Sequence, residues 1–451
     1  MKQTYSYYQR VREFIIILLP IFITQLALVS TGFFDTIMAG HVSGQDLAGV
    51  AVGVNLFMPV FGSVLGVIAG LMPIIAQYYG AGRKTEIAIN VRQGMYWALL
   101  AGLGLAALGA LLVPLVMAML QLEDRVQYVA CYYLLLMAAG LCPIFVAGVL
   151  RSFIDALGYT RLTMLITILA VPINILLNYL FMFGRGGFPA LGGIGAGVGT
   201  AVTFYFVLAL NILAVVCLRP FKEYKIFSGI ARPAWHIWRS QLAVGIPIGS
   251  AMFCEQSIFG AVGMFMTVYG TGVIAAHQAA MNFSTMVYMI PLSISMTLTI
   301  LVGFEIGAKR FSDAQAYGSM GIFLSICFGL GMAAVLISFR SQIAALYTAD
   351  PAVGALLEQF LIFSACLHAV DGVSAPMQGT LRGCKDVRVT LLLAILSYWI
   401  IGLPTGYLFA NYLGSGPFGY WIGLVLGIGV GALFLGIRLR RVQQRMQLMK
   451  L

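Results

Sequence analysis

Three carboxylates stand inside long apolar segments of this sequence. They are Asp35 in GFFDTIMAG, Glu255 in AMFCEQSIFGAVGMFM and Asp371 in CLHAVDGVSAP. Glu255 has no lysine or arginine within fifteen residues on either side, and no long apolar segment carries a basic residue in its middle third. A carboxylate in such surroundings must face a polar cavity or a partner. With no basic partner in view, the pattern favours a cation that binds and leaves.

Each candidate site has polar companions in the apolar segments. Asn174 and Asn178 in VPINILLNY share one helix face at i and i+4 and could meet Asp35. Tyr288 in VYMIPLS offers a hydroxyl beside Pro291.

Two histidines also lie inside apolar segments. His368 precedes Asp371 by about one turn, and His277 stands in a separate segment. We expect both to be packed, hydrogen-bonded side chains.

The composition places all these residues in a membrane. The chain has 451 residues, of which 61% are hydrophobic and only 9% charged, whereas soluble domains are about half apolar and a quarter charged. Segments of about 20 apolar residues can cross the hydrocarbon layer as helices. Twelve occur, at about 14–37, 47–75, 93–118, 128–150, 162–183, 194–218, 242–268, 274–302, 316–339, 354–378, 389–411 and 418–437. The sequence therefore predicts an all-α membrane protein with twelve transmembrane helices.

The basic residues predict the orientation. With the N-terminus in the cytoplasm, 23 of the 26 lysines and arginines, including Lys2 and Lys450, fall in cytoplasmic segments, and only Arg125, Arg185 and Arg340 fall outside. Cytoplasmic loops of membrane proteins are expected to be the basic ones. We therefore expect a multi-pass protein of the cytoplasmic membrane with both termini inside. The net charge of +11 is explained by this topology and by anionic lipid, so no nucleic-acid partner is expected.

An internal repeat divides the chain into halves. At a shift of 227 residues, Pro20-Ile21 falls on Pro247-Ile248, Asn55 on Asn282 and Gly80-Ala81 on Gly307-Ala308. At a shift of 224, Gly192, Gly195 and Gly199 fall on Gly416, Gly419 and Gly423. Parallel repeats of this kind occur in transporters that bind substrate between their halves. We predict two pseudo-symmetric six-helix lobes, 1–218 and 242–451, joined by a basic cytoplasmic linker, 219–241.

The sequence contains no convincing enzyme motif. GAGRKT at 80–85 lacks the order of a phosphate-binding loop and follows a membrane helix. Gly195-x-x-x-Gly199 is explained by close helix packing. No catalytic residue, enzyme activity or organic cofactor is expected.

Five segments taken together resemble one family. GFFDTIMAG, FCEQSIF, VYMIPLS, ADPAV at 349–353 and the Asp371 segment are similar to those of the multidrug and toxic compound extrusion (MATE) family, in its NorM-like branch, along the whole chain. This resemblance implies antiport of Na⁺ or H⁺ against amphipathic organic cations by alternating access between two lobes. It implies no obligatory protein partner.

The resemblance also implies roles for individual residues. It places a cation site, for Na⁺ as the metal, at Glu255, Asp371 and Tyr288, and a second ion or proton site at Asp35, Asn174 and Asn178. Gln278 and Asp350 match substrate-contacting positions, to which we add Asp35 and Asn55. Leu367 stands where some relatives carry a tyrosine, and Met182 stands where another branch carries an aspartate.

Two alternatives remain open. A lipid-linked precursor flippase would be expected to line its cavity with basic residues that bind a pyrophosphate. A polytopic membrane enzyme would need paired catalytic groups near an interface.

Overall fold

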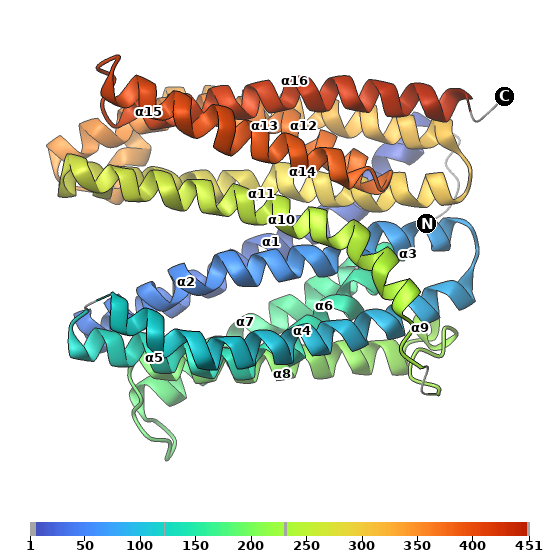
Figure 1. Cartoon of the computed structure of the whole chain (residues 1–451), viewed down its shortest axis with the longest axis horizontal. Helices are drawn as coiled ribbons and strands as arrows, with labels where there is room; N and C mark the ends of the chain where they lie inside the picture. Colours follow the sequence, from blue (N-terminus) through green and yellow to red (C-terminus); the bar gives the residue numbers. More distant parts are fainter. Residues whose placement is uncertain (1–5, 121, 230–231, 449–451) are drawn as a thin grey trace. The chain divides into compact units, whose positions relative to one another are not determined.

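The computed structural model describes residues 6–120, 122–229 and 232–448, and in these ranges it contains helices and no strand. Lys2, Lys450 and residues 230–231 of the predicted linker lie outside the described residues. The chain divides into two compact units. The N unit is Leu19–Gly249, and the C unit combines the residues up to Leu18 with those from Ser250 onward. Helix α1 (Tyr7–Val42) and helix α10 (Trp235–Met266) therefore each contribute to both units (Figure 1).

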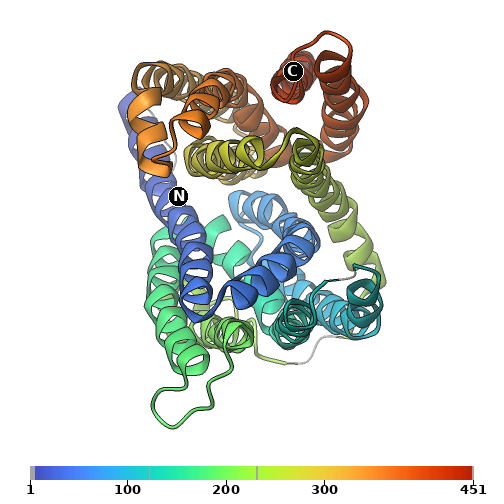
Figure 2. The ribbon, with the colours of Figure 1, turned by 90° about the vertical axis from the view of Figure 1, so that its left-hand side faces the viewer.

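The N unit is a helical bundle in which α7 packs on α8, α4 on α6, and α2 on α5. Its helices run nearly along the viewing direction in Figure 2. Besides parts of α1 and α10 it contains α2 (Gly44–Ala69), α3 (Leu71–Gly80), α4 (Lys84–Met119), α5 (Asp124–Ala139), α6 (Leu141–Ala156), α7 (Thr160–Phe183), α8 (Gly193–Cys217) and α9 (Arg219–Lys222).

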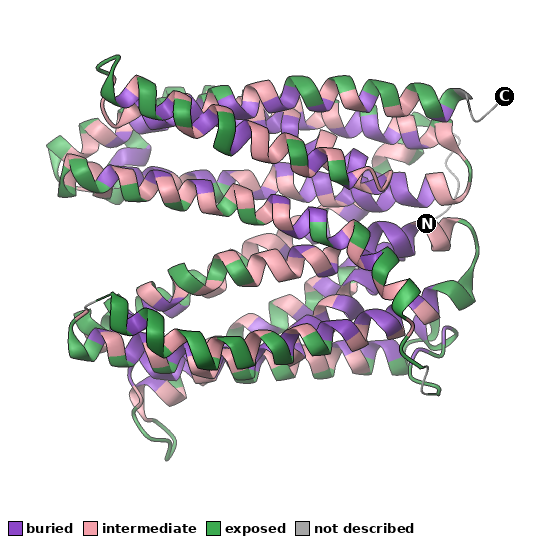
Figure 3. Cartoon of the chain, viewed as in Figure 1, coloured by how far each residue is buried: buried purple, intermediate pink, exposed green. Residues whose placement is uncertain are grey.

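The C unit is centred on α11, which packs against α12 and α13 and is largely buried (Figure 3). Helix α16 lies against α13, α15 and η2. The elements are η1 (Thr267–Tyr269), α11 (Thr271–Gly307), α12 (Phe311–Tyr347), α13 (Pro351–Gly383), α14 (Val387–Ile395), the π-helix η2 (Leu396–Gly402), α15 (Leu403–Asn411) and α16 (Phe418–Leu448).

The predicted all-α membrane fold is confirmed. Eleven helices among the described residues are long and apolar enough to cross a membrane, and the bent pair α5 and α6 makes a twelfth span. Eleven of the twelve predicted segments fall within one of these spans, and 194–218 extends one residue beyond its span, which ends at Cys217. The structure adds breaks that the apolar pattern did not show. The fourth span bends by 48° at Gly140, and the eleventh contains η2.

Local sequence signals explain several helix ends. Helix α2 begins after Ser43, whose hydroxyl accepts a hydrogen bond from the Asp46 amide at 3.0 Å. Helix α13 begins after Asp350, whose carboxylate caps the Ala352 amide at 2.9 Å, with Pro351 in the first turn. Helix α7 ends at Gly184 in the left-handed conformation that glycine adopts without strain.

Left-handed residues recur at the spacing of the internal repeat. Gly82 (φ 69°) and Lys309 (φ 59°) lie 227 positions apart, as do Gly158 (φ 87°) and Lys385 (φ 59°). Each pair falls in the short turn between consecutive helices. The two halves of the sequence thus form the same turns, although only one half has glycine at these two positions.

Exchanging side chains at one such pair tests this equivalence. A left-handed backbone costs an L-residue roughly 1–2 kcal/mol, part of which glycine's larger unfolded-state entropy offsets. We expect Lys309→Gly to raise the free energy of unfolding by roughly 0.5–1 kcal/mol, and Gly82→Ala, whose new methyl group meets no atom within 4 Å, to lower it by about the same amount. Thermal melts in detergent measure both. Destabilisation by Lys309→Gly would contradict the strain at this turn.

The predicted linker segment packs on α4 in the N unit. The Arg92 guanidinium donates to the Ile226 and Lys225 carbonyl oxygens, each at 2.6 Å. The Gln93 side chain donates to the Arg232 carbonyl at 2.8 Å and accepts from the Trp238 indole at 2.7 Å. These bonds fix the described part of the segment against one helix.

Candidate functional site

The C unit brings the predicted residues Glu255, Tyr288 and Asp371 together from α10, α11 and α13. Tyr288 is hydrogen-bonded to the Glu255 side chain. The Asp371 carboxylate interacts electrostatically with both Glu255 and Tyr288. Asp371 is buried, whereas the other two side chains are partly exposed. Three oxygen-bearing side chains from three helices thus meet in one place.

A second tyrosine joins this cluster from a segment that sequence reasoning did not single out. Tyr398 is buried in η2, and its hydroxyl interacts electrostatically with Glu255, Asp371 and Tyr288. The π-helical turn is held close to α10 by a hydrogen bond from the Trp399 indole to the Cys254 carbonyl oxygen, at 3.2 Å. π-Helical turns are frequent at functional sites. The sequence signal that could have identified Tyr398 is its polar hydroxyl within the apolar run LSYWIIG.

As predicted, no ion pair within 4 Å joins Asp35, Glu255 or Asp371 to a basic side chain among the described residues, but Glu255 interacts electrostatically with one arginine, Arg382. Arg382 lies in the last turn of α13, which continues past the predicted end of its span to Gly383. Its guanidinium is partly buried and interacts electrostatically with Glu255, Tyr288 and Tyr398. The sequence placed Arg382 in a loop because the predicted span ends at residue 378. The distance between Arg382 and Glu255 along the chain hides their proximity in the fold.

The two buried histidines differ. His277 has the expected hydrogen bond, because its Nδ1 atom accepts from the Trp421 indole at 3.1 Å. His368 is packed, with 1% of its surface exposed, but neither ring nitrogen has a hydrogen-bond partner among the described residues. The expectation of a hydrogen-bonded His368 is therefore wrong. Close packing of α12 on α13, where Gly329 meets the His368 backbone, explains its burial.

The N unit brings Asp35 of α1 to the asparagines of α7, as their helical spacing predicted. The Asn178 side-chain amide donates to the Asp35 carboxylate at 2.5 Å and to the Asn174 side-chain oxygen Oδ1 at 3.2 Å. The Asn174 amide donates to the Thr200 hydroxyl at 3.2 Å, and Thr200 is also hydrogen-bonded to Asp35. Both asparagines are fully buried. The buried Asn178 Oδ1 atom has no hydrogen-bond partner among the described residues.

Glycines of α8 allow this cluster to form. A Cβ atom at Gly195 would overlap the backbone of Phe181 and Met182, and one at Gly199 would overlap the Asn178 side-chain oxygen. The predicted role of Gly195 and Gly199 in close helix packing is confirmed. At Gly199 the missing side chain also leaves the space that the Asn178 amide occupies.

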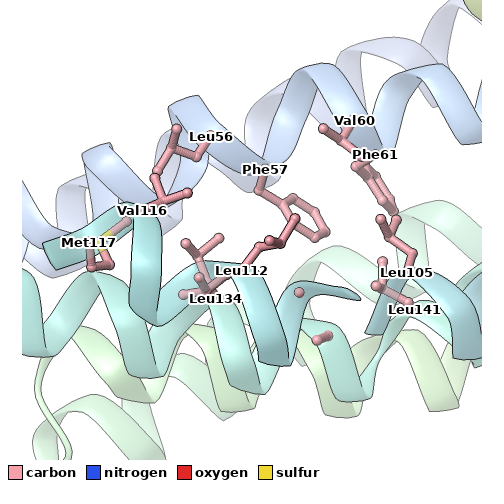
Figure 4. Close-up of a pocket in the computed structure, with 13 residues that line it drawn as sticks. Leu56, Phe57, Val60, Phe61, Leu105, Leu112, Val116, Met117, Leu134 and Leu141 are labelled. Carbon is pink, nitrogen blue, oxygen red and sulfur yellow. The ribbon is translucent and has the colours of Figure 1, made fainter. Parts of the chain in front are cut away.

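An apolar pocket of about 230 Å³ lies beside this cluster's helices, between α2, α4 and the α5–α6 pair (Figure 4). Phe57 and Phe61 stack in its wall with ring centroids 4.8 Å apart. The remaining lining is aliphatic except for one methionine, and no titratable side chain contributes: Leu56, Val60, Leu105, Gly109, Leu112, Val113, Val116, Met117, Leu134, Ala138 and Leu141. The pocket suits flat lipophilic rings.

The residues predicted to touch substrate are not gathered in one place. Asn55 and Asp35 belong to the N unit, whereas Gln278 and Asp350 belong to the C unit. Asn55, Gln278 and Asp350 are exposed. Asp350 caps α13, which is sufficient to explain its carboxylate, so its contact with substrate stays a prediction.

The described part of the chain forms no metal site built from three or more carboxylate, histidine or cysteine side chains. Asp35 lies in one unit, and Glu255 and Asp371 lie in the other. Any cation at Glu255 and Asp371 must therefore take further oxygens from hydroxyl groups, backbone carbonyls or water.

Comparisons with a family model and with curated relatives point to the same family. The family model MatE matches residues 20–180 and 247–408, one match in each half of the chain. The probable multidrug resistance protein NorM of Bacillus subtilis (strain 168) is 46% identical over 445 residues, covering 99% of this chain and 98% of the relative. The protein of the same name from Oceanobacillus iheyensis is 44% identical, covering 99% of this chain and 100% of the relative.

Solved structures share the fold at low sequence identity. The eukaryotic MATE transporter AtDTX14 aligns with a TM-score of 0.87 and 17% identity, over 97% of this chain and 99% of that one. The Vibrio cholerae MATE transporter VcmN aligns with a TM-score of 0.88 and 18% identity, over 97% of this chain and 98% of that one.

Proposed function

Because the chain belongs to the MatE family, and its matched relatives carry the name multidrug resistance protein, we propose that it is a multidrug efflux transporter that exchanges a coupling cation for amphipathic organic cations. The observation that carries the coupling is the meeting of Glu255, Asp371 and Tyr288 in the C unit. Two acids that share one site repel each other electrostatically, and a bound cation relieves that repulsion.

Na⁺ is the coupling ion that we favour at this site. Hard cations need several oxygen ligands at once, and three helices supply carboxylate and hydroxyl oxygens here. Leu367 is buried in α13 and offers no oxygen, so the site relies on Tyr288 and on water for ligands beyond the carboxylates. A proton would need only one of the carboxylates.

The Asp35 cluster is a second cation or proton site in this proposal. Asp35, Asn174 and Asn178 present oxygens in a buried space, and the unpartnered Asn178 Oδ1 atom would gain a partner from a bound cation or a water. An unsatisfied buried acceptor costs free energy, so cation binding here is favoured. Protons are the simplest ligand for a site with one carboxylate.

The substrate is an amphipathic organic cation in this scheme. Aromatic rings such as Phe57 and Phe61 attract flat cations through their faces, and the apolar pocket of the N unit supplies lipophilic surface. Asp35, Asn55, Gln278 and Asp350 remain the proposed polar contacts.

The described helices make this a multi-pass membrane protein. We place it in the cytoplasmic membrane with both termini inside, on the distribution of its basic residues. The two six-helix lobes, 1–218 and 242–451, with 219–241 as their linker, are the proposed moving parts of alternating access. A flippase for a pyrophosphate-linked lipid is less favoured, because Arg382 is the single basic residue at the acid cluster of the C unit among the described residues.

Drug efflux from proteoliposomes tests the proposal directly. Purified protein is reconstituted with a fluorescent organic cation, and flux is measured under an inward Na⁺ gradient at equal pH, under a proton gradient without Na⁺, and with K⁺ or choline in place of Na⁺. We expect Na⁺ to stimulate efflux at least about tenfold over choline. Coupling free energies between two ligands are typically about 1–3 kcal/mol, which corresponds to roughly 5- to 150-fold. Full efflux on a proton gradient alone, with no response to Na⁺, would assign the site to protons. No flux under either gradient would contradict antiport.

A further inference from the structure

A polar track runs along one face of α13 from the acid cluster to the basic end of the helix. Asp371, Ser374, Gln378 and Arg382 follow at intervals of three, four and four residues, which places them on one helix face. The Gln378 side-chain amide donates to the Ser374 hydroxyl at 3.4 Å, and the Arg382 guanidinium donates to the Gln378 side-chain oxygen Oε1 at 3.3 Å. A helix that only packs against its neighbours in a membrane does not need such a chain of side-chain hydrogen bonds.

A small cavity opens beside this track inside the C unit. Its volume is about 10 Å³, close to the space that one water molecule needs. Half of the residues that line it are polar: Ser374, Gln378, Thr390, Ser397 and Tyr398. A water molecule there would find several hydrogen-bond partners, so the cavity can hydrate the Gln378 side chain in the middle of the track.

The cavity depends on the π-helix η2 and on glycines of α16. The Ser397 hydroxyl donates to the Leu393 carbonyl at 2.6 Å, and any Cβ atom at Gly431 would overlap that hydroxyl. A Cβ atom at Gly427 would likewise overlap the Ser397 carbonyl oxygen. Helix α16 therefore approaches η2 closely enough to bring Tyr398 and Ser397 to the cavity. These close contacts keep the polar side chains of η2 at the cavity.

Arg382 is the only charged group of the track besides Asp371. Its guanidinium is held by Gln378 and interacts electrostatically with Glu255 and Tyr288, which belong to the cation site. No carboxylate lies within 4 Å of the Arg382 side chain among the described residues, whereas Arg310 and Arg438 form close ion pairs. The positive charge of Arg382 therefore acts on Glu255 without forming a close ion pair with it.

We propose that Arg382 competes electrostatically with the coupling cation for Glu255, and that Gln378 positions its guanidinium for this role. The inference rests on the cation site of the proposed function. A fixed positive charge near the site weakens cation binding and so promotes release, and it also balances Glu255 when the site is empty. Arg382 is therefore a positioning and tuning residue that sets how tightly the site holds its cation.

Binding of radioactive sodium to purified protein at alkaline pH tests this role. We expect Arg382→Gln to bind Na⁺ about tenfold more tightly, because one unit charge at the edge of a partly buried site is worth roughly that factor. Arg382→Lys should stay close to the wild type, and Gln378→Leu should fall between the two. Efflux turnover by Arg382→Gln should decrease, because the cation leaves slowly. A merely structural arginine would give no tighter binding.

Arg388→Gln is the matched control, because it removes the same charge from an exposed position six residues away. Its Na⁺ affinity should equal that of the wild type. If the wild type binds protons in place of Na⁺, the midpoint pH of proton-triggered drug release should rise by about one unit in Arg382→Gln.

The outcomes separate the two proposals. Unchanged cation affinity in Arg382→Gln, with binding lost in Glu255→Gln, would overturn the role of Arg382 and leave the cation site standing. If Glu255→Gln changes neither Na⁺ binding nor proton binding, the cation site itself is overturned, and the role of Arg382 with it.

Discussion

Replacing Asp371 by asparagine, or Glu255 by glutamine, is expected to abolish cation-coupled drug efflux while the protein remains folded. Both variants keep the shape of the side chain and remove one charge from the cluster. Loss of a charged ligand costs about 3 kcal/mol of cation binding, which corresponds to roughly a hundredfold loss of affinity. Initial rates of efflux from proteoliposomes should therefore fall about a hundredfold or more.

The fold should tolerate these changes. A buried carboxylate without a bound cation carries a desolvation cost that the amide avoids, so thermal stability in detergent should stay level or rise. The double variant should be no worse than either single variant, because the two carboxylates act on one cation. Additive losses would indicate two separate sites.

Glu358→Gln is the matched control on the same helix as Asp371. Glu358 forms a loose pair with Arg340 at 3.7 Å, and its side chain is 34% exposed. Exposed ion pairs contribute little to stability, and Glu358 lies far along α13 from the cluster. Efflux at the wild-type rate is expected. Wild-type drug resistance in both Glu255→Gln and Asp371→Asn would show that the acids of the cluster serve structure alone.

Gly199→Ala is expected to disrupt the N-unit cluster and remove transport activity. The added methyl group would occupy the position of the Asn178 side-chain oxygen and would also press on the Asn178 backbone. Either Asn178 rotates away from Asp35, or α8 moves away from α7. Overpacking of a close helix contact costs roughly 1–3 kcal/mol, so the melting temperature should fall together with efflux.

The same substitution at Gly104 provides the control. Gly104 also lies within a helix of the N unit, but a methyl group there meets no atom within 4 Å. Gly104→Ala should leave efflux unchanged and add up to about 1 kcal/mol of stability through helix propensity. Equal behaviour of the two variants would mean that the contact between Gly199 and Asn178 is unimportant.

Asn178→Ala separates packing from chemistry at this cluster. It removes the hydrogen bond to Asp35 and leaves the Gly199 contact open. If the amide serves the ion site, efflux should fall as in Gly199→Ala while the contact of α7 with α8 survives. Normal efflux would assign the amide to packing.

The sequence by itself determined the membrane class, the number of spans and the residues most worth testing. Apolar segments of membrane-spanning length are a local property, because each helix satisfies its own backbone hydrogen bonds within the hydrocarbon. The spacing of Asn174 and Asn178 is also local, and it correctly predicted that both amides share the face that meets Asp35. The match of Gly80-Ala81 with Gly307-Ala308 likewise predicted an internal repeat, and the structure forms equivalent turns just after both pairs.

Only the tertiary structure decided which distant side chains share a site. Arg382 looked like a loop residue, and Tyr398 looked like one more aromatic residue in an apolar run. Both interact electrostatically with Glu255, although all three residues lie far apart in the sequence. The lack of a hydrogen bond at His368 likewise follows from how α12 meets α13. Helix periodicity fixes the face of each helix, but contacts between helices far apart in sequence depend on packing of side chains against one another, and that packing is not written in any single segment.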